Sequence, residues 1–309
     1  MAKKVVVFGS FVADMTGRGP KFPVAGETVL GTSFKVGPGG KGSNQAVAAH
    51  RAGADVCFIT KLGADTFGQM ARSFYEAEGM DTRYLLIDPE ASTGGALIMV
   101  NEQTAQNEIM VILGACNQFS DADLESRREK IESADILLLQ METNPDALEK
   151  VIRMAHEKGV RMVLNPAPAR PIADELLGMI DTVTPNETEA FTLTGVKVEN
   201  KEDAHRAAQV FLSKGVKNVV ITLGEHGVYV TDGAREELYE RITVKAMDTT
   251  GAGDAFNGGF VTALSMGKDL FEAARFGNCT GALSVTKIGT APAMPTREEI
   301  EALYQKQYC

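Results

Sequence analysis

The chain has 309 residues, of which 44% are hydrophobic and 23% charged, and this provides enough apolar material for the core of a large globular enzyme. Its 31 Lys and Arg against 41 Asp and Glu give a net charge of −10, a field that repels the phosphates of nucleic acids and anionic membrane surfaces. We therefore expect neither a nucleic-acid partner nor a membrane role. A nucleotide can still bind, because backbone N–H groups and Mg²⁺ set the local potential.

Cysteine usage and the absence of a linker bear on location and domain organisation. The cysteines show no CxxC spacing, which is typical of reduced thiols in a cytoplasmic protein; they are Cys57, Cys116, Cys279 and Cys309. Residues 1–8 hold too short an apolar run for an export signal, and no run approaches the ~18 apolar residues of a membrane span. No Ser/Pro-rich linker divides the chain, so we predict a single domain over residues 1–309.

Short apolar runs alternate with helix-like stretches along the chain. The expected strands lie at 5–8, 56–59, 136–139, 162–164 and 219–221, and the expected helices at 44–52, 67–78, 145–157 and 202–213. Continuous apolar runs are typical of strands buried on both faces, and the β-α-β-α order is typical of a parallel sheet. The sequence therefore predicts an α/β sandwich.

Two stretches break this rhythm. Residues 14–36 and 92–113 contain extended, Gly-punctuated segments with no following helix, so they are predicted to form extra strands. Beside the carboxyl edge of the main sheet, where open α/β sheets bind ligands, such strands would form a lid over a site. The residues alone leave a simple extension of the sheet equally open.

The strongest chemical signal is the run from Asp248 to Gly259, in which small residues lead directly into an apolar helical stretch. Gly251, Ala252 and Gly253 would expose backbone N–H groups at a helix N-terminus, where an anion such as a phosphoryl group in transfer is favoured. Asp254 follows, and an aspartate that accepts the attacking hydroxyl's proton is a recurrent part of phosphoryl transfer. A capped helix start explains one Asp, but not Gly-Ala-Gly together with Asp248.

A second glycine-rich run, from Gly37 to Ala46, precedes a predicted helix. It contains GxGxxG but does not follow the first strand, which argues against a dinucleotide fingerprint. It is not a P-loop either, because Lys35 stands where the first Gly belongs and Gly42 follows the Lys in place of Ser or Thr. Its backbone, together with Asn44, offers donors and acceptors to a polyhydroxylated molecule such as a sugar.

The runs Gly39–Asn44 and Asp248–Gly259 resemble the two signatures of the ribokinase (PfkB) carbohydrate kinase family, in the expected order. The similarity extends over nearly the whole chain. It implies a three-layer α/β sandwich with a central, mostly parallel sheet and a small β lid. It also implies ATP-dependent phosphorylation of the terminal hydroxyl of a pentose, with D-ribose as the first candidate and 2-deoxy-D-ribose or another sugar as alternatives.

The resemblance also assigns roles to residues. Asp254 becomes the general base, with an anion hole formed by Gly251, Ala252 and Gly253. The sugar is expected at Val12, Asp14, Gly40, Lys41, Gly42, Ser43, Asn44 and Glu142. ATP is expected at Asn186, Thr222, Leu223, Gly224, Glu225, His226, Gly227, Gly253 and Asn278. Mg²⁺ is expected to reach Glu189 through water, and a monovalent cation such as K⁺ is expected at Asp248, Thr250, Ser284, Lys287, Gly289 and Ala293.

Two of these assignments compete with purely structural explanations. Asn186 followed three residues later by Glu189 is also a capping box, which could serve only the stability of a helix. Glu142 could be a solvated acid in the loop after a buried strand.

One position departs from the family pattern. Ribokinase-like chains usually carry Asn where this sequence has Val12, and deoxyribokinases of the family also have an apolar residue there. Loss of a polar partner lowers the penalty for binding a sugar that lacks one hydroxyl. Val12 therefore keeps 2-deoxyribose open as a substrate.

Other classes of protein remain as alternatives. A nucleotide-dependent oxidoreductase would need a fingerprint after the first strand, and a non-catalytic nucleotide-binding protein would be expected to lose Asp254. A nucleoside or pyridoxal kinase would share the phosphoryl-transfer turn. The resemblance also predicts a homodimer formed through the lid strands, to which the extended stretch 96–100 is suited.

Overall fold

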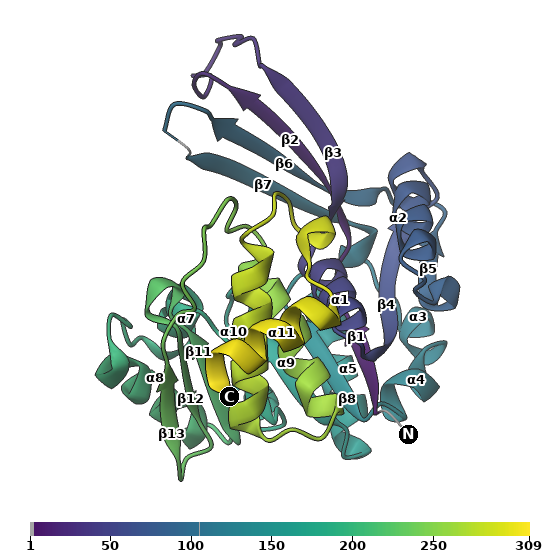
Figure 1. Cartoon of the computed structure of the whole chain (residues 1–309). Helices are drawn as coiled ribbons and strands as arrows, with labels where there is room; N and C mark the ends of the chain where they lie inside the picture. Colours follow the sequence, from purple (N-terminus) through teal and green to yellow (C-terminus); the bar gives the residue numbers. More distant parts are fainter. Residues whose placement is uncertain (1–2, 105) are drawn as a thin grey trace.

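A computed structural model of the protein describes residues 3–104 and 106–309 (Figure 1). Within these residues, nine strands form one sheet in the order β13-β12-β11-β10-β9-β8-β1-β4-β5. Their bounds are β1 Lys4–Phe8, β4 Asp55–Gly63, β5 Leu85–Asp88, β8 Ile136–Gln140, β9 Arg161–Asn165, β10 Thr182–Val183, β11 Asn218–Thr222, β12 Val228–Thr231 and β13 Glu236–Tyr239. Neighbours from β5 to β11 run parallel, and β12 and β13 follow antiparallel at one edge.

Side chains of the central strands alternate between two apolar cores. Val5 and Val7 of β1 pack into one core, whereas Val6 and Phe8 pack into the other. The first core lies under α1 (Lys41–Arg51), α2 (Thr66–Ala77), α9 (Ala252–Ser265), α10 (Leu270–Ser284) and α11 (Arg297–Tyr308). The second lies under α3 (Asp121–Glu125), α4 (Arg128–Glu132), α5 (Pro145–Glu157), α6 (Asp174–Leu177), α7 (Glu187–Thr194) and α8 (Lys201–Ser213). The predicted three-layer α/β sandwich is confirmed.

The five strands and four helices expected from the sequence are present, with ends that differ by a few residues. Helix α1 begins at Lys41 instead of residue 44, directly after Gly40, whose φ of 90° no other residue type adopts readily. The short strands β5, β10, β12 and β13 were not expected, because runs of two to four residues carry little periodic signal. Among the described residues, no helix combines the length and apolarity needed to cross a membrane.

A separate four-stranded sheet, called here the small sheet, projects from one end of the main body (Figure 1). Its order is β3-β2-β6-β7, with bounds β2 Val12–Gly19, β3 Ser33–Gly39, β6 Thr93–Asn101 and β7 Asn107–Gly114. Only the β2–β6 pair is parallel. These strands come from the segments predicted to break the βα rhythm; position 105 of the segment 92–113, and positions 1 and 2 of the predicted domain, lie outside the described residues.

Helices α1 and α9 are packed very closely. A Cβ on Gly258 would lie 2.4 Å from Ala48 Cβ and 2.7 Å from Ala49 N, a spacing that real Cβ contacts do not show. Thr262 Oγ1 donates to Ala49 O at 3.2 Å and so joins the same two helices. At the start of α1, a Cβ on Gly42 would lie 2.5 Å from Ser10 N. Glycine at these positions therefore fixes how near α1 lies to its neighbours.

Gly258→Ala tests this packing. We expect the free energy of unfolding to fall by about 1–3 kcal/mol, because overpacking against α1 outweighs the helix propensity gained. Denaturant unfolding of both proteins measures the difference. Gly253→Ala in the same helix, where a new Cβ meets nothing within 4 Å, is the matched control and should lose no stability. Equal stability of the Gly258 variant and the wild type would contradict the close-packing argument.

Candidate active site

Helix α9 begins at the turn predicted to bind an anion. Gly251 precedes the helix with a φ of 81°, in the left-handed region that favours glycine. Ala252 N donates to Thr249 O at 3.3 Å, so the turn uses this N–H group internally. Gly253 is exposed, and a Cβ there would meet nothing within 4 Å. Of the three residues of the predicted anion hole, Gly253 thus offers the most accessible backbone.

Asp254 follows in the first turn of α9 and is 7% exposed. Its Oδ2 accepts a hydrogen bond from Asn44 Nδ2, and its Oδ1 accepts one from Gln45 Nε2, both at 2.9 Å. Burial raises the pKa of Asp254, while the Lys41 ammonium and these two amides oppose the rise and Glu142 adds to it. A carboxylate in this environment is suited to accept a proton. The two glycine-rich runs therefore meet at Asp254.

The Lys41 ammonium is the positive charge that acts on Asp254. Burial lowers the pKa of Lys41, but the charges of Asp254, Glu142 and Glu189 outweigh burial and leave that pKa raised. Burial also raises the pKa of Glu189, against the lowering effects of an Asn186 backbone hydrogen bond and of Lys41. Lys41 therefore stays charged among several buried carboxyl groups.

Glu142 follows strand β8 and is 6% exposed, so it is not the solvated loop acid that the sequence left open. Its Oε2 accepts from Ser10 Oγ at 2.5 Å and from Lys41 N at 2.9 Å. Glu142 thereby joins the connection after β1 to the start of α1.

Asp14 reaches the same region from strand β2 of the small sheet. A Cβ on Gly39 of the paired strand β3 would lie 2.2 Å from its carboxyl group, so glycine makes room for the carboxylate. Thr290 Oγ1 lies 3.3 Å from Asp14 Oδ2 and 3.1 Å from Pro38 O. Burial raises the pKa of Asp14 to about 6, opposed by the Thr290 hydroxyl and reinforced by Glu142 and Asp254.

The other residues predicted to bind the sugar differ in their burial and in their hydrogen bonds. Val12 is 3% exposed at the start of β2, and the backbone of Gly40 and Gly42 packs against the chain around Ser10 and Phe11. Ser43 is fully buried, and its Oγ accepts from Tyr75 OH at 2.7 Å, so its hydroxyl faces the core. Asn44 Oδ1 is buried and has no hydrogen-bond partner among the described residues. This orphaned acceptor is a feature expected of a site that awaits a hydroxyl donor.

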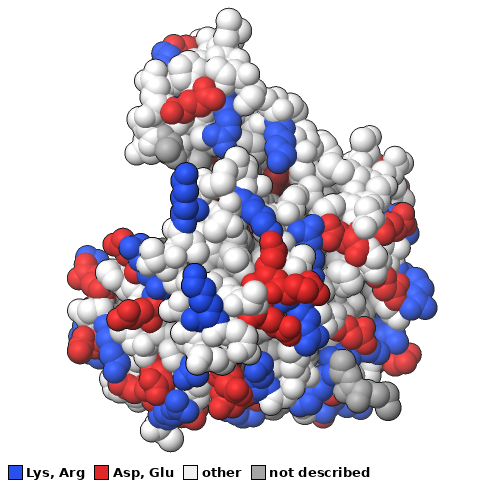
Figure 2. Space-filling model, viewed as in Figure 1, with Lys and Arg blue, Asp and Glu red and all other residues white. Residues whose placement is uncertain are grey.

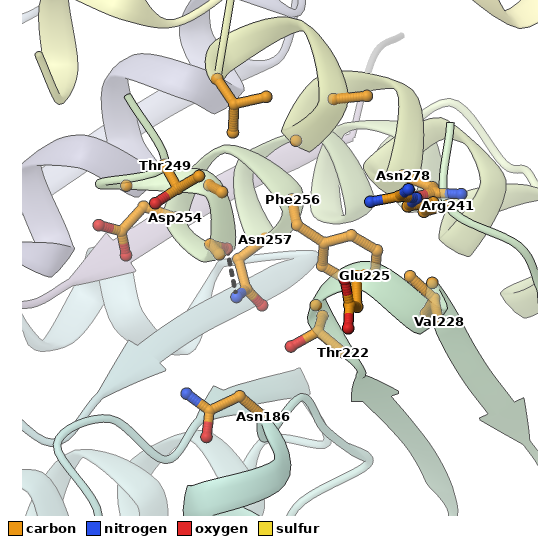
Figure 3. Close-up of a pocket in the computed structure, with 18 of the residues that line it drawn as sticks. Asn186, Thr222, Glu225, Val228, Arg241, Thr249, Asp254, Phe256, Asn257 and Asn278 are labelled. Atoms are coloured by element: carbon orange, nitrogen blue, oxygen red, sulfur yellow. Dashed lines mark hydrogen bonds between the residues drawn. The ribbon is translucent and has the colours of Figure 1, made fainter. Parts of the chain in front are cut away.

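A cavity of about 690 Å³ opens beside Asp254, a size suited to a nucleotide. Asp254 and Thr249 lie at one end of it and Asn278 and Arg241 at the other, with Phe256 between them (Figure 3). Of the residues predicted to bind ATP, those that line the cavity are Asn186, Thr222, Gly224, Glu225, Gly227, Gly253 and Asn278.

Leu223 and His226, also predicted to bind ATP, do not line this cavity. Leu223 is buried in the core against the second helix layer, and His226 is exposed in the turn after β11. Both lie on a neighbouring surface hollow instead. The turn offers its glycines to the cavity and directs these two side chains elsewhere.

The capping box at α7 is present. Asn186 Oδ1 accepts from Glu189 N at 2.8 Å, and Glu189 Oε2 accepts from Asn186 N at 2.9 Å. Both residues also line the cavity. A structural role and a binding role therefore coincide at these positions, and with Oε1 accepting from Asn186 Nδ2 at 3.0 Å, both Glu189 oxygens already have partners.

The positions predicted to bind a monovalent cation come from two segments of the chain, 248–250 and 284–293. Asp248 accepts from Thr250 N at 3.0 Å and from Gly289 N at 3.1 Å. Ser284 Oγ donates to Gly281 O at 2.8 Å, Lys287 Nζ pairs with Glu299 at 3.0 Å, and the N–H of Ala293 donates to Thr290 O at 2.9 Å. The side chains of Asp248, Ser284 and Lys287 are therefore engaged within the protein.

Several residues around the site were missed by sequence reasoning. They are Ser10, Gln45, Asn165, Thr184, Arg241, Phe256, Asn257 and Thr290. Gln45 and Asn257 belong to the two glycine-rich runs, so their place in those motifs was a usable signal. Arg241 and Thr290 lie in irregular segments without a pattern to single them out.

The chain is similar to known proteins in both sequence and fold. Residues 2–297 match the family described as pfkB family carbohydrate kinase. The chain is 44% identical to "Ribokinase" of Haemophilus influenzae over 97% of each chain, and 34% identical to "Deoxyribokinase" of Salmonella typhi over 96% of each. It also resembles the solved structure of Arabidopsis thaliana ribokinase complexed with ribose and ATP, with a TM-score of 0.89, 32% identity and coverage of 99% of both chains.

Proposed function

Because this chain belongs to the pfkB family of carbohydrate kinases, we propose that it transfers the γ-phosphoryl group of ATP to the terminal hydroxyl of D-ribose. Similarity to ribokinases over nearly the full length supports the substrate, and the related structure that holds ribose and ATP supports the pairing of sugar and nucleotide. The observation that carries the proposal is the buried Asp254, which lies at the end of a nucleotide-sized cavity and bonds to Asn44 of the glycine-rich run.

Asp254 acts as the general base in this proposal. It takes the proton of the terminal hydroxyl while that oxygen bonds to the γ-phosphorus and the bond from phosphorus to the bridging oxygen of ADP breaks. The open backbone at Gly253 and the N-terminus of α9 stabilise the charge of the phosphoryl group in transfer. The products are the sugar phosphate, ADP and the proton on Asp254.

Sugar recognition falls to Asp14, Asn44 and Lys41, supported by Glu142. A carboxylate such as Asp14 accepts hydrogen bonds from adjacent hydroxyl groups, and the orphaned Asn44 Oδ1 accepts another. Buried acceptors of this kind reject sugars that leave them unpaired. Gly40, Gly42 and Ser43 contribute backbone and shape, since the Ser43 hydroxyl faces Tyr75.

ATP occupies the cavity, with its base toward Asn278 and its phosphates toward Asn186 and Gly253. Glu189, whose oxygens are already hydrogen-bonded, would meet a bound Mg²⁺ through water, and the ion would supply positive charge to neutralise the phosphates. Backbone carbonyl groups of the segments around Asp248 and Gly289, which a hydrogen bond joins, would hold a bound K⁺. We further propose that the protein works in the cytoplasm, which its reduced-thiol pattern supports.

Asp254→Asn is the direct test of the base. It removes the proton acceptor but keeps a side chain of the same shape, so the turnover number should fall by about 10²–10⁴-fold while ribose binding by calorimetry changes little. Asp181→Asn is the matched control, because Asp181 lies just before β10 at the amino edge of the sheet and binds Met162 N and Lys217. An Asp254 variant that keeps most of its rate would refute the assignment.

Substrate choice can be tested at Val12. The apolar, buried Val12 and the deoxyribokinase relative favour 2-deoxy-D-ribose as the second candidate substrate. Val12→Asn should raise the ratio of kcat/KM for ribose over 2-deoxyribose about tenfold, because a buried amide left unpaired penalises the deoxy sugar. The exposed Val24→Asn is the control. An unchanged ratio would show that Val12 does not set the selectivity between the two sugars. Assays with adenosine and with fructose as the phosphoryl acceptor test whether the protein is instead a nucleoside kinase or a kinase of another sugar.

We also propose a homodimer that pairs through the small sheet. Successive residues of β7 point to opposite faces, yet Ile109, Met110, Val111 and Ile112 are between 44% and 63% exposed, so both faces present apolar surface. Figure 2 shows this projecting part of the molecule as largely uncharged next to the charged main body.

Light scattering on the wild type should give twice the chain mass at micromolar concentration. Val111→Glu and Ile112→Glu place a charge on opposite faces of β7, and the one on the contact face should give monomer, because a buried unpaired charge is costly. Phe191→Glu, an equally exposed apolar site on α7, should stay dimeric. A monomeric wild type would refute the dimer.

A further inference from the structure

Gln45 lies behind Asp254 with a fully buried side chain. One N–H of its Nε2 donates to Asp254 Oδ1 at 2.9 Å, and Nε2 also lies 2.9 Å from Asn165 Oδ1. Its Oε1 accepts from Gln140 Nε2 at 2.7 Å. Both ends of the Gln45 amide are therefore occupied by defined partners.

The orientation of this amide is set by a backbone carbonyl. Thr184 O can only accept, so Asn165 must point Nδ2 toward it, and does so at 3.0 Å. Asn165 Oδ1 then faces Gln45, which in turn must present Nε2. The second N–H of that group is thereby aimed at Asp254. A flipped Gln45 would set two acceptors against Oε1, which makes the reverse arrangement costly.

Thr184 also reaches the phosphoryl-transfer turn by a second route. Its Oγ1 donates to Asn257 Oδ1 at 2.6 Å, and Asn257 Nδ2 donates to Gly253 O at 2.9 Å. Thr184 is 1% exposed and Asn257 is also 1% exposed. Thr184, which directly follows β10, is thus linked to Asp254 through its carbonyl group, by way of Asn165 and Gln45. It is linked to Gly253 through its hydroxyl group, by way of Asn257.

We propose that Gln45 is a positioning residue, which holds the Asp254 carboxylate in one orientation and favours its charged form, with its own orientation dictated by the Asn165–Thr184 chain. This rests on the proposed role of Asp254 as the base. Gln45 is not expected to touch the sugar, because its polar atoms are already used within the protein.

The charges and hydrogen bonds around Asp254 determine in which direction its pKa changes when the Gln45 hydrogen bond is lost. Burial raises the pKa of Asp254, Lys41 from α1 lowers it, and Glu142 raises it further. Asp14 of β2 and Glu189 of α7 also interact with it as like charges. The hydrogen bonds from Gln45 and Asn44 stabilise the ionised form. Without the Gln45 bond, the pKa of Asp254 rises, so the base is lost at a higher pH as the solution is acidified.

Gln45→Met keeps the shape and removes the donor. The rate of a single turnover, followed between about pH 5 and 9, should show its acidic limb moved up by about one pH unit and a rate near neutrality lowered about tenfold, with KM for ATP little changed. Asn165→Leu, which frees the Gln45 amide to turn, should move the limb in the same direction by less. It also keeps the test available if the Gln45 variant does not fold.

Thr262→Val is the control for stability, since it removes a buried hydrogen bond between the same two helices without facing Asp254. It should lower the unfolding midpoint and leave the acidic limb in place. The proposal is overturned if Gln45→Met keeps the wild-type limb, or if Thr262→Val moves the limb equally.

A second readout does not depend on turnover. Carboxyl carbons of ¹³C-labelled aspartate can be titrated by NMR in the free protein, with the Asp254 signal assigned from its absence in Asp254→Asn. Its pKa should be higher in Gln45→Met than in the wild type. If the pKa of Asp254 is raised in Gln45→Met but the wild type phosphorylates no sugar, the proposed function is refuted and the positioning role stands. If the pKa of Asp254 is the same in both proteins while the wild type is active, the positioning role alone is refuted.

Discussion

The close contact between α1 and α9 is the constraint on which the site depends. Asn44 and Gln45 reach Asp254 only because Gly258 lets α9 approach Ala48 and Ala49 at a distance that no side chain permits. The residues joined in this way are about 210 positions apart in the chain. Each glycine-rich run therefore allows the helices that carry the polar side chains to come together, in addition to the ligand-binding role proposed for its backbone.

This packing concentrates carboxyl groups at a site with little exposure to solvent. Glu142, Glu189 and Asp254 interact with Lys41, and Asp14 interacts with Glu142 and Asp254. Burial raises the pKa of Asp14 to about 6 and raises that of Asp254 and Glu189 as well. Such an arrangement opposes folding, since each buried carboxylate has lost water. The two large apolar cores on either side of the sheet offset this cost, and the site is stable because the surrounding layers are.

The parts of the fold and of the candidate site that could be predicted are those whose pattern lies within a short stretch of sequence. The strands at 5–8 and 136–139 were evident because burial on both faces leaves an unbroken apolar run. The roles proposed for the glycine-rich runs rest on their small residues and on family likeness. Thr290 and Arg241 could not be found, because their contacts join irregular segments that only the fold brings together. Ser43 stands within a motif, yet the helical twist turns its hydroxyl to Tyr75 and the core.

The two halves of the site are attached to the main body in different ways. Asn44 and Gln45 share a packed core with Asp254, so their distances to it are fixed by the main body. Asp14 instead lies on β2, paired with β3 and β6 of the small sheet, one residue beyond Ala13 of the first core, and Thr290 Oγ1 lies 3.3 Å from its carboxylate. A displacement of the small sheet would therefore change the spacing between Asp14 and Asp254 but leave the base and its amide partners in place. Any contact that fixes the small sheet, including one with a second copy of the chain, would thus act on Asp14, the proposed sugar ligand, before it acts on Asp254, the proposed base.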